Sequence, residues 1–216
     1  MEKRFPRSRW GTAKWQKGMH AVNSETFRLG SDARIVTRVS QILGPDLLLS
    51  GSMVINQRPG HFHAWHVDAE QLDWQGVTVW VALANVTARS TMRVVTGSHR
   101  IAGRPPTGGR TGPNDDAVLA EARRHAPDSR ILSLPAAPGQ FYMLASHLWH
   151  STWNETGKLR HAVIFQYCRP DVPVRWPVRA RLHDPLLPIK APYEVPCCLV
   201  SGEDHHQKNL LVTPPL

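Results

Sequence analysis

The pattern of apolar positions changes along the chain from a helical period to short strand-like runs. Apolar side chains three and four residues apart predict a helix over residues 31–44. Ser31 can cap this helix, and Gly44-Pro45 ends it. The apolar stripe of the predicted helix consists of Ile35, Val36, Val39, Ile42 and Leu43.

Beyond this helix, β-branched and apolar runs separated by Gly/Pro turns predict a series of short strands. They cover residues 47–56, 76–86, 92–96, 131–134, 140–144 and 160–167, and residues 61–68 form a further short aromatic, His-rich segment. One helix followed by about seven short strands predicts a mainly β fold. We expect a double-stranded β-helix, that is, a cupin-like jelly roll, with a supporting N-terminal helix. A β-sandwich of another topology is the alternative.

A long insertion interrupts the strands. Residues 101–114 are rich in Pro and Gly, and residues 115–125 predict a short helix that opens with Asp115-Asp116. Long ordered insertions are often functional lids, so we expect residues 101–126 to select the substrate.

Composition bounds the domain organisation. The chain has 216 residues and is 41% apolar, which suits one domain over residues 1–216. We expect a basic arm over residues 1–17, a jelly-roll core over residues 46–168 and a Pro-rich extended tail over residues 169–216. The tail would lie on the domain or form an oligomer contact, and the sequence leaves the oligomeric state open.

Several locations are disfavoured by the same composition. No apolar run approaches the ~20 residues of a membrane helix, and the N-terminus has no apolar segment typical of a secretory signal. Three cysteines, of which Cys197 and Cys198 are adjacent, form neither a disulfide framework nor a typical metal pair. A cytoplasmic protein is therefore expected.

The formal net charge of +9 is concentrated at the N-terminus. Residues 1–17 hold six basic residues against Glu2, together with Trp10 and Trp15. Such an arm could contact nucleic acid, but no nucleic-acid-binding motif accompanies it. We therefore favour a solvated arm, and we expect the positive charge to suit a small anionic substrate.

The segment His61-Phe-His-Ala-Trp-His66-Val-Asp68 carries the first candidate chemistry. In a strand, residues two apart point the same way, so His66 and Asp68 can both reach one metal ion. A lone His-x-Asp pair is weak evidence, because chance produces it readily. His61 and His63 also share a face, which keeps an all-imidazole cupin-type site open.

A third ligand has to come from elsewhere in the chain, and His147, His150 and His161 are the candidates in the C-terminal half. Two histidines and one carboxylate on one face of an ion are typical of non-haem Fe(II) oxygenases. The open positions take a 2-oxoacid and then O2. The far carboxylate of that 2-oxoacid needs a bidentate cation, which Arg160 can supply.

These pieces together resemble the phytanoyl-CoA dioxygenase family of Fe(II)/2-oxoglutarate-dependent oxygenases. The matching segments lie in the family's order over about residues 46–168. They are Trp65-His66-Val-Asp68, Val79-Trp80-Val-Ala-Leu83, Val94-Val95-Thr-Gly97-Ser98-His99-Arg100, Pro138-Gly139-Gln-Phe141, His150-Ser-x-x-Asn154 and Arg160.

The resemblance implies a role for each matching residue. His66, Asp68 and His150 would bind iron, and Arg160 would form a salt bridge with 2-oxoglutarate. The cosubstrate would also meet Thr152, while Gln57 and Trp80 would line the cosubstrate or substrate pocket. The turn over residues 97–100 is interpreted as structural.

The implied reaction is hydroxylation of an unactivated C–H bond in a small natural-product, amino-acid or acyl-type substrate, with O2 consumed and succinate and CO2 released. Related halogenases have Ala or Gly in place of Asp68, so the carboxylate favours hydroxylation. Desaturation, epoxidation and cyclisation use the same oxidant and stay open.

Two other hypotheses remain. One is a cupin-like metal enzyme that uses His61, His63 and His150 without 2-oxoglutarate. The other is a non-enzymatic β-sandwich whose basic arm contacts nucleic acid.

Overall fold

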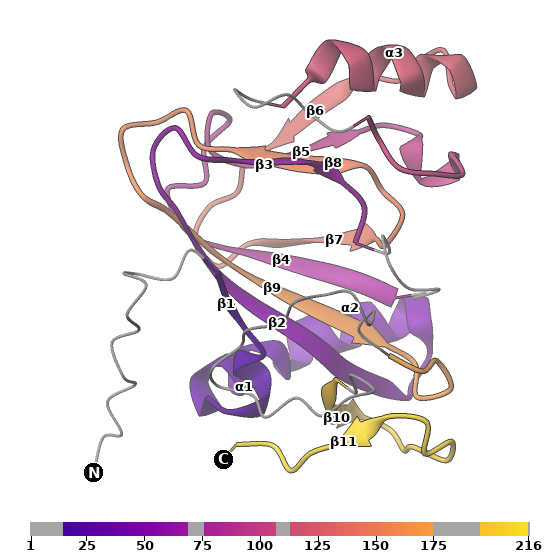
Figure 1. Ribbon diagram of the computed structural model, residues 1–216. Helices are drawn as coiled ribbons and strands as arrows, with labels where there is room; N and C mark the ends of the chain where they lie inside the picture. Colours follow the sequence, from indigo (N-terminus) through magenta and orange to yellow (C-terminus); the bar gives the residue numbers. More distant parts are fainter. Residues whose placement is uncertain (1–14, 69–75, 107–112, 175–194, 216) are drawn as a thin grey trace.

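Two β-sheets face each other in the computed structural model, with helices on their outer sides (Figure 1). The structure describes residues 15–68, 76–106, 113–174 and 195–215. The architecture is a jelly roll, which confirms the predicted fold class. Within the described residues, no helix is both long and apolar enough to cross a membrane.

The larger sheet is built around two long antiparallel strands, β2 (Leu47–Gln57) and β9 (Arg160–Cys168). Its order is β11-β10-β2-β9-β4-β7, and β1 also pairs with β2. The remaining strands are β1 (Trp15–Lys17), β4 (Gly76–Ala84), β7 (Phe141–Ala145), β10 (Pro196–Ser201) and β11 (Leu210–Leu211).

The smaller sheet has the order β3-β8-β5-β6. Its strands are β3 (Phe62–His66), β8 (His150–Trp153), β5 (Met92–Val95) and β6 (Ile131–Leu134). The sequence analysis predicted no strand over residues 150–153, where the segment His-Ser-Thr-Trp is short and mostly polar. In the structure this segment is a strand, since β3 and β5 pair with it on both sides.

Two helices cover the outer face of the larger sheet after a short 3-10 turn, Met19–Ala21. They are α1 (Ser24–Gly30), which was not predicted, and α2 (Ala33–Leu43). Asp32 caps α2 through Arg34 N, so the predicted Ser31 cap is wrong. The Ser31 hydroxyl instead donates to Phe27 O, 2.9 Å away, at the end of α1. Gly44, at φ 99°, ends α2 as expected.

The apolar stripe of α2 is only partly buried. Ile35 and Val39 pack into the core against Leu49 and Phe165 of the larger sheet. Ile42, which the pattern placed on the same stripe, is 58% exposed and does not belong to this core cluster.

Helix α3 (Asp115–His125) has the predicted bounds and packs on the outer face of the smaller sheet (Figure 1). Its Val118 lies in one apolar cluster with Trp65 and Trp149. Neighbouring strand residues point to opposite faces, so His66 and His150 face away from α3. The helix therefore does not cover the side of the sheet that carries these histidines, as a lid would. Residues 107–112 of the expected lid lie outside the described residues.

The C-terminal tail is more ordered than expected where it is described. Strand β10 pairs antiparallel with β2, from Cys198 opposite Leu49 to Ser201 opposite Leu47. The sheet thus extends beyond the expected core of residues 46–168. Residues 1–14 of the basic arm and residues 175–194 of the tail lie outside the described part of the chain.

Candidate metal centre and buried arginine

Two histidines meet across the smaller sheet. His66 at the end of β3 is the register partner of His150 at the start of β8, and their ring centroids are 4.1 Å apart. Each Nδ1 lies 2.8 Å from a backbone carbonyl two residues earlier, that of Ala64 or Leu148. A carbonyl only accepts, so both Nδ1 atoms carry the hydrogen and both Nε2 atoms keep a lone pair.

Asp68 completes a cluster with these two rings. Its Oδ1 lies 4.0 Å from His66 Nε2 and 3.6 Å from His150 Nε2. Its other oxygen accepts a hydrogen bond of 2.5 Å from the Thr78 hydroxyl, which fixes the carboxylate. We call His66, Asp68 and His150 the histidine-aspartate cluster.

Across the described ranges, this is the only group of three or more His, Cys, Asp or Glu residues whose ligand atoms lie within 4.8 Å of one another. The alternative set of His61, His63 and His150 is not brought together. His61 is exposed, and the His63 ring lies against His66 at 4.1 Å without joining the group. The other candidates lie elsewhere: His147 contacts Ser146, and His161 contacts Asn56.

The electrostatics of the cluster favour a neutral imidazole at His66. Burial lowers the pKa of His66 well below its ordinary value, and the nearby His150 and His63 rings lower it further. A neutral ring is the form that binds a metal ion.

Two further residues support the cluster, of which the sequence analysis did not single out Thr78. Thr78 holds Asp68, as described above. Ser98 accepts a hydrogen bond of 2.9 Å from Trp149 N, directly before His150, and donates to Val95 O at 2.7 Å. Ser98 can reach both because the turn begins with Gly97 at φ 79°. The turn over residues 97–100 was interpreted as structural, and its contacts agree with that.

The four other predicted site residues also lie together, between the two sheets. The Arg160 guanidinium donates through Nη2 to Gln57 Oε1, and Gln57 Nε2 donates to Thr152 Oγ1 at 3.1 Å. Arg160 Cζ lies 5.1 Å from the centre of the Trp80 ring. We call Arg160, Gln57, Thr152 and Trp80 the arginine cluster.

Arg160 is fully buried, yet most of its hydrogen-bonding capacity is unused. Its Nε and Nη1 have no partner among the described residues. Burial lowers the pKa of Arg160 to about 10, so the side chain is still charged at neutral pH. A buried cation without an anion is costly, and an anionic ligand would relieve that cost.

Tyr142 is a further residue at this site that the sequence analysis missed. It lies opposite Trp80 in the pairing of β7 with β4, and the two rings stack at 5.1 Å with an angle of 5°. In the sequence it lies in the apolar run Phe-Tyr-Met-Leu, a pattern that predicts a core residue. Only the strand pairing places it beside the arginine cluster.

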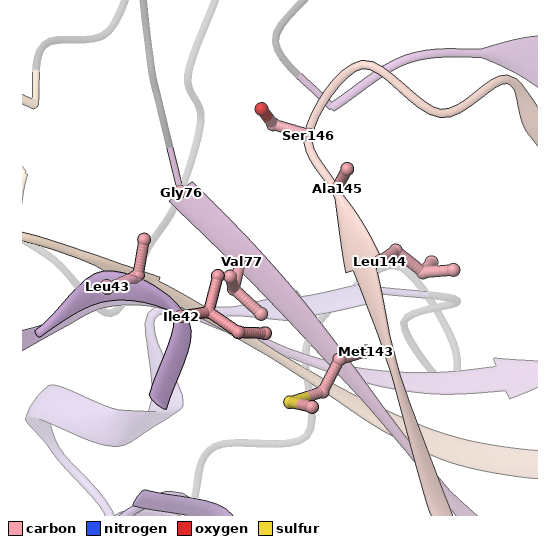
Figure 2. A pocket seen from close by; sticks show the side chains of 8 residues that line it. All are labelled: Ile42, Leu43, Gly76, Val77, Met143, Leu144, Ala145 and Ser146. Carbon is pink, nitrogen blue, oxygen red and sulfur yellow. The ribbon is translucent and has the colours of Figure 1, made fainter. Parts of the chain in front are cut away.

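A separate groove of about 240 Å³ lies between the end of α2, β4 and β7 (Figure 2). Ile42, Val77 and Met143 give it a mostly apolar lining, and Ser146 lies at one end. None of its lining residues belongs to the histidine-aspartate cluster or the arginine cluster.

The family model described as phytanoyl-CoA dioxygenase (PhyH) matches residues 8–162. The chain belongs to this family. No curated protein matched the sequence.

Solved structures of non-haem oxygenases share the fold of this phytanoyl-CoA dioxygenase family member. The apo form of ThoJ, a non-heme monooxygenase, is 24% identical with a TM-score of 0.66, covering 92% of this chain and 69% of ThoJ. The epimerase SnoN, in complex with Fe3+, alpha ketoglutarate and nogalamycin RO, is 21% identical with a TM-score of 0.65, covering 92% and 75%. EctD from S. alaskensis, with 2-oxoglutarate and 5-hydroxyectoine, is 22% identical with a TM-score of 0.60, covering 74% and 58%.

Proposed function

We propose that this protein is an Fe(II)- and 2-oxoglutarate-dependent dioxygenase that oxidises a C–H bond of a small molecule. The observation that carries the proposal is the convergence of His66, Asp68 and His150 on one point, with a buried and largely unpaired Arg160 in the same fold. Family membership and the Fe3+ and alpha ketoglutarate named for SnoN support the same reading.

The histidine-aspartate cluster fits a ferrous ion. It offers two neutral Nε2 atoms and one anionic oxygen, the donor set of non-haem iron sites, and it leaves coordination positions open. The carbonyls of Ala64 and Leu148 orient the rings, and Thr78 orients the carboxylate. Bound iron with 2-oxoglutarate supplies the oxidant for an unactivated C–H bond.

The arginine cluster fits the far carboxylate of 2-oxoglutarate. Arg160 presents Nε–H and Nη1–H that no described residue accepts. The Thr152 hydroxyl accepts from Gln57, so its own hydrogen is available for the ligand. Gln57 uses both ends of its amide on Arg160, Thr152 and His61 O, and we propose that it positions the first two.

Hydroxylation is the outcome that we propose, because Asp68 occupies the position that related halogenases leave to a halide. The neighbours include a monooxygenase, an epimerase and a carbocyclase, so the fold accommodates several outcomes. The net charge of +9 supports an anionic substrate, and the cysteine content supports a cytoplasmic location.

The test is Fe(II)-dependent conversion of 2-oxoglutarate to succinate under O2, which such enzymes show at low rate without substrate. We expect His150→Ala to abolish succinate formation and His147→Ala, which changes an exposed histidine in the same segment, to retain it. In anaerobic titrations, Asp68→Ala should bind Fe(II) at least ~100-fold more weakly. Removing a residue that only hydrogen-bonds to a metal ligand already weakens metal binding by up to about 100-fold, and Asp68 would be a ligand itself. Succinate formation by His150→Ala, or unchanged iron affinity in Asp68→Ala, would contradict the proposal.

A further inference from the structure

Two buried side chains close to Arg160 also have hydrogen-bond donors without a partner among the described residues. Across the part of the chain that the structure describes, the buried side-chain atoms without a partner include Trp80 Nε1, the Tyr142 hydroxyl, and Arg160 Nε and Nη1. Trp80 and Arg160 are fully buried, and the Tyr142 hydroxyl oxygen is enclosed although its ring is partly exposed. These atoms are therefore shielded from water that could otherwise satisfy them.

Trp80 lies against both of the other two side chains, Tyr142 and Arg160. The Tyr142 ring stacks on Trp80 at 5.1 Å, and Arg160 Cζ lies 5.1 Å from the centre of the same ring. Burial raises the pKa of Tyr142, and the charge of Arg160 opposes that shift to a smaller extent. The unused donors thus belong to neighbouring side chains between the sheets.

The chemistry of these atoms points to one kind of ligand. An indole N–H and a guanidinium can only donate hydrogen bonds, and a protonated phenol can donate one as well. Burial raises the pKa of Tyr142 far above neutral pH, so its hydroxyl keeps the hydrogen. A group with several acceptor oxygens and a negative charge, such as a carboxylate, would use these donors together.

No residue that the structure describes forms a hydrogen bond with the Tyr142 hydroxyl. It lies near the Thr91 side chain and the Met92 backbone, but neither meets it with hydrogen-bond geometry. The Thr91 hydroxyl donates elsewhere, to Leu134 O. An enclosed hydroxyl without a protein partner costs free energy, and a hydrogen bond to a ligand would remove that cost.

We propose that Tyr142 is a cosubstrate-binding residue whose hydroxyl donates to the same distal carboxylate that Arg160 binds. This inference rests on the proposed function and extends it to a residue outside the matching family segments. Tyr142 would then select for a 2-oxoacid with a second carboxylate, because a ligand without that group leaves the hydroxyl unpaired.

Calorimetric titration of the Mn(II)-loaded protein tests the inference, since Mn(II) occupies the metal site without turnover. The ligands are 2-oxoglutarate and oxalate, which can chelate the metal but lacks a distal carboxylate. We expect Tyr142→Phe to weaken 2-oxoglutarate binding by about ten- to a hundredfold, the range for a hydrogen bond to a charged group, and to leave oxalate binding unchanged.

Tyr167→Phe is the matched control. Its hydroxyl is also buried, but it donates to Gly30 O at 2.6 Å on the outer face of the larger sheet. This variant should lose stability and bind both ligands as the wild type does.

The possible failures are distinguishable. Equal 2-oxoglutarate affinity in Tyr142→Phe and wild type would overturn the role of Tyr142, and so would an equal loss for both ligands, which indicates general structural damage. A wild type that binds oxalate but not 2-oxoglutarate would overturn the proposed function itself, and the inference with it.

Discussion

Strand β2 carries two buried polar clusters, one on each face. On the outer face, Ser52 contacts His20, whose Nδ1 lies 3.0 Å from Ser52 Oγ and whose Nε2 lies 3.0 Å from Pro196 O. On the inner face, Gln57 contacts Arg160, which uses only one of its nitrogens on a described partner. Both His20 and Arg160 are almost completely buried.

Burial alone does not separate these two clusters. It lowers the pKa of His20 to about 4 and that of Arg160 to about 10. What differs is whether the protein itself satisfies the buried group. His20 has a partner for each ring nitrogen and connects β2 to β10, so it serves the fold. Arg160 keeps two nitrogens without a partner among the described residues, which lowers the stability of the fold. A bound anionic ligand would restore that stability.

The largest expected effect concerns the satisfied cluster. His20 has a pKa near 6.5 when unfolded and about 4 when folded, so between these values only the unfolded chain binds the proton. Its contribution to the free energy of unfolding is complete above pH 6.5 and falls by about 3 kcal/mol as the pH drops to 4. Urea unfolding of wild type and His20→Leu at pH 7.5 and 4 measures this. If the free energy of unfolding fell equally between pH 7.5 and 4 in both proteins, His20 would not contribute to stability as we infer.

The second prediction concerns the unsatisfied cluster. We expect Arg160→Met to be at least as stable as wild type, because it removes a buried charge that lacks an anion. The same variant should bind 2-oxoglutarate about 100-fold more weakly, since it loses a charge-assisted pair of hydrogen bonds. Thermal unfolding without ligand and calorimetry with Mn(II) and 2-oxoglutarate measure the two effects.

Arg93→Met is the control for this variant. Arg93 is also largely buried, but it pairs with Asp115 at 2.5 Å and with Ser151 at 3.3 Å. The control should therefore lose stability and retain 2-oxoglutarate affinity. If Arg160→Met instead destabilised the protein as strongly as Arg93→Met, the two arginines would not differ as we infer.

The smallest expected effect tests the side chain that orients the unsatisfied cluster. Gln57→Leu leaves Arg160 and Thr152 in place but frees their rotation, so we expect 2-oxoglutarate to bind about tenfold more weakly. Fe(II) affinity should not change, because the histidine-aspartate cluster has its own supports. Anaerobic titrations measure both affinities, and Gln41→Leu on the exposed side of α2 is the control. A loss of Fe(II) affinity in Gln57→Leu would show that the two clusters are not independent.

Much of the fold could be predicted because its determinants are local. The bounds of α3 follow from the acidic pair at its start, and those of β2, β4 and β9 follow from long apolar or β-branched runs between turns. The cap of α2 was misplaced by one residue, since Ser31 and Asp32 are both good capping residues. Strand β8 was missed because a short polar segment shows no period of its own.

The sequence alone determined which residue types are available and how they are spaced. The His-x-Asp spacing indicated that His66 and Asp68 serve one site, although β3 ends at His66 and Asp68 lies in the turn that follows. The ordered motifs indicated His150 and Arg160. Only the tertiary structure decided what meets what. Strand pairing brought His150 opposite His66 and Tyr142 opposite Trp80, and it left Arg160 with unused donors. Side-chain periodicity is set within a few residues, whereas the partners of a buried polar group come from strands far apart in the chain.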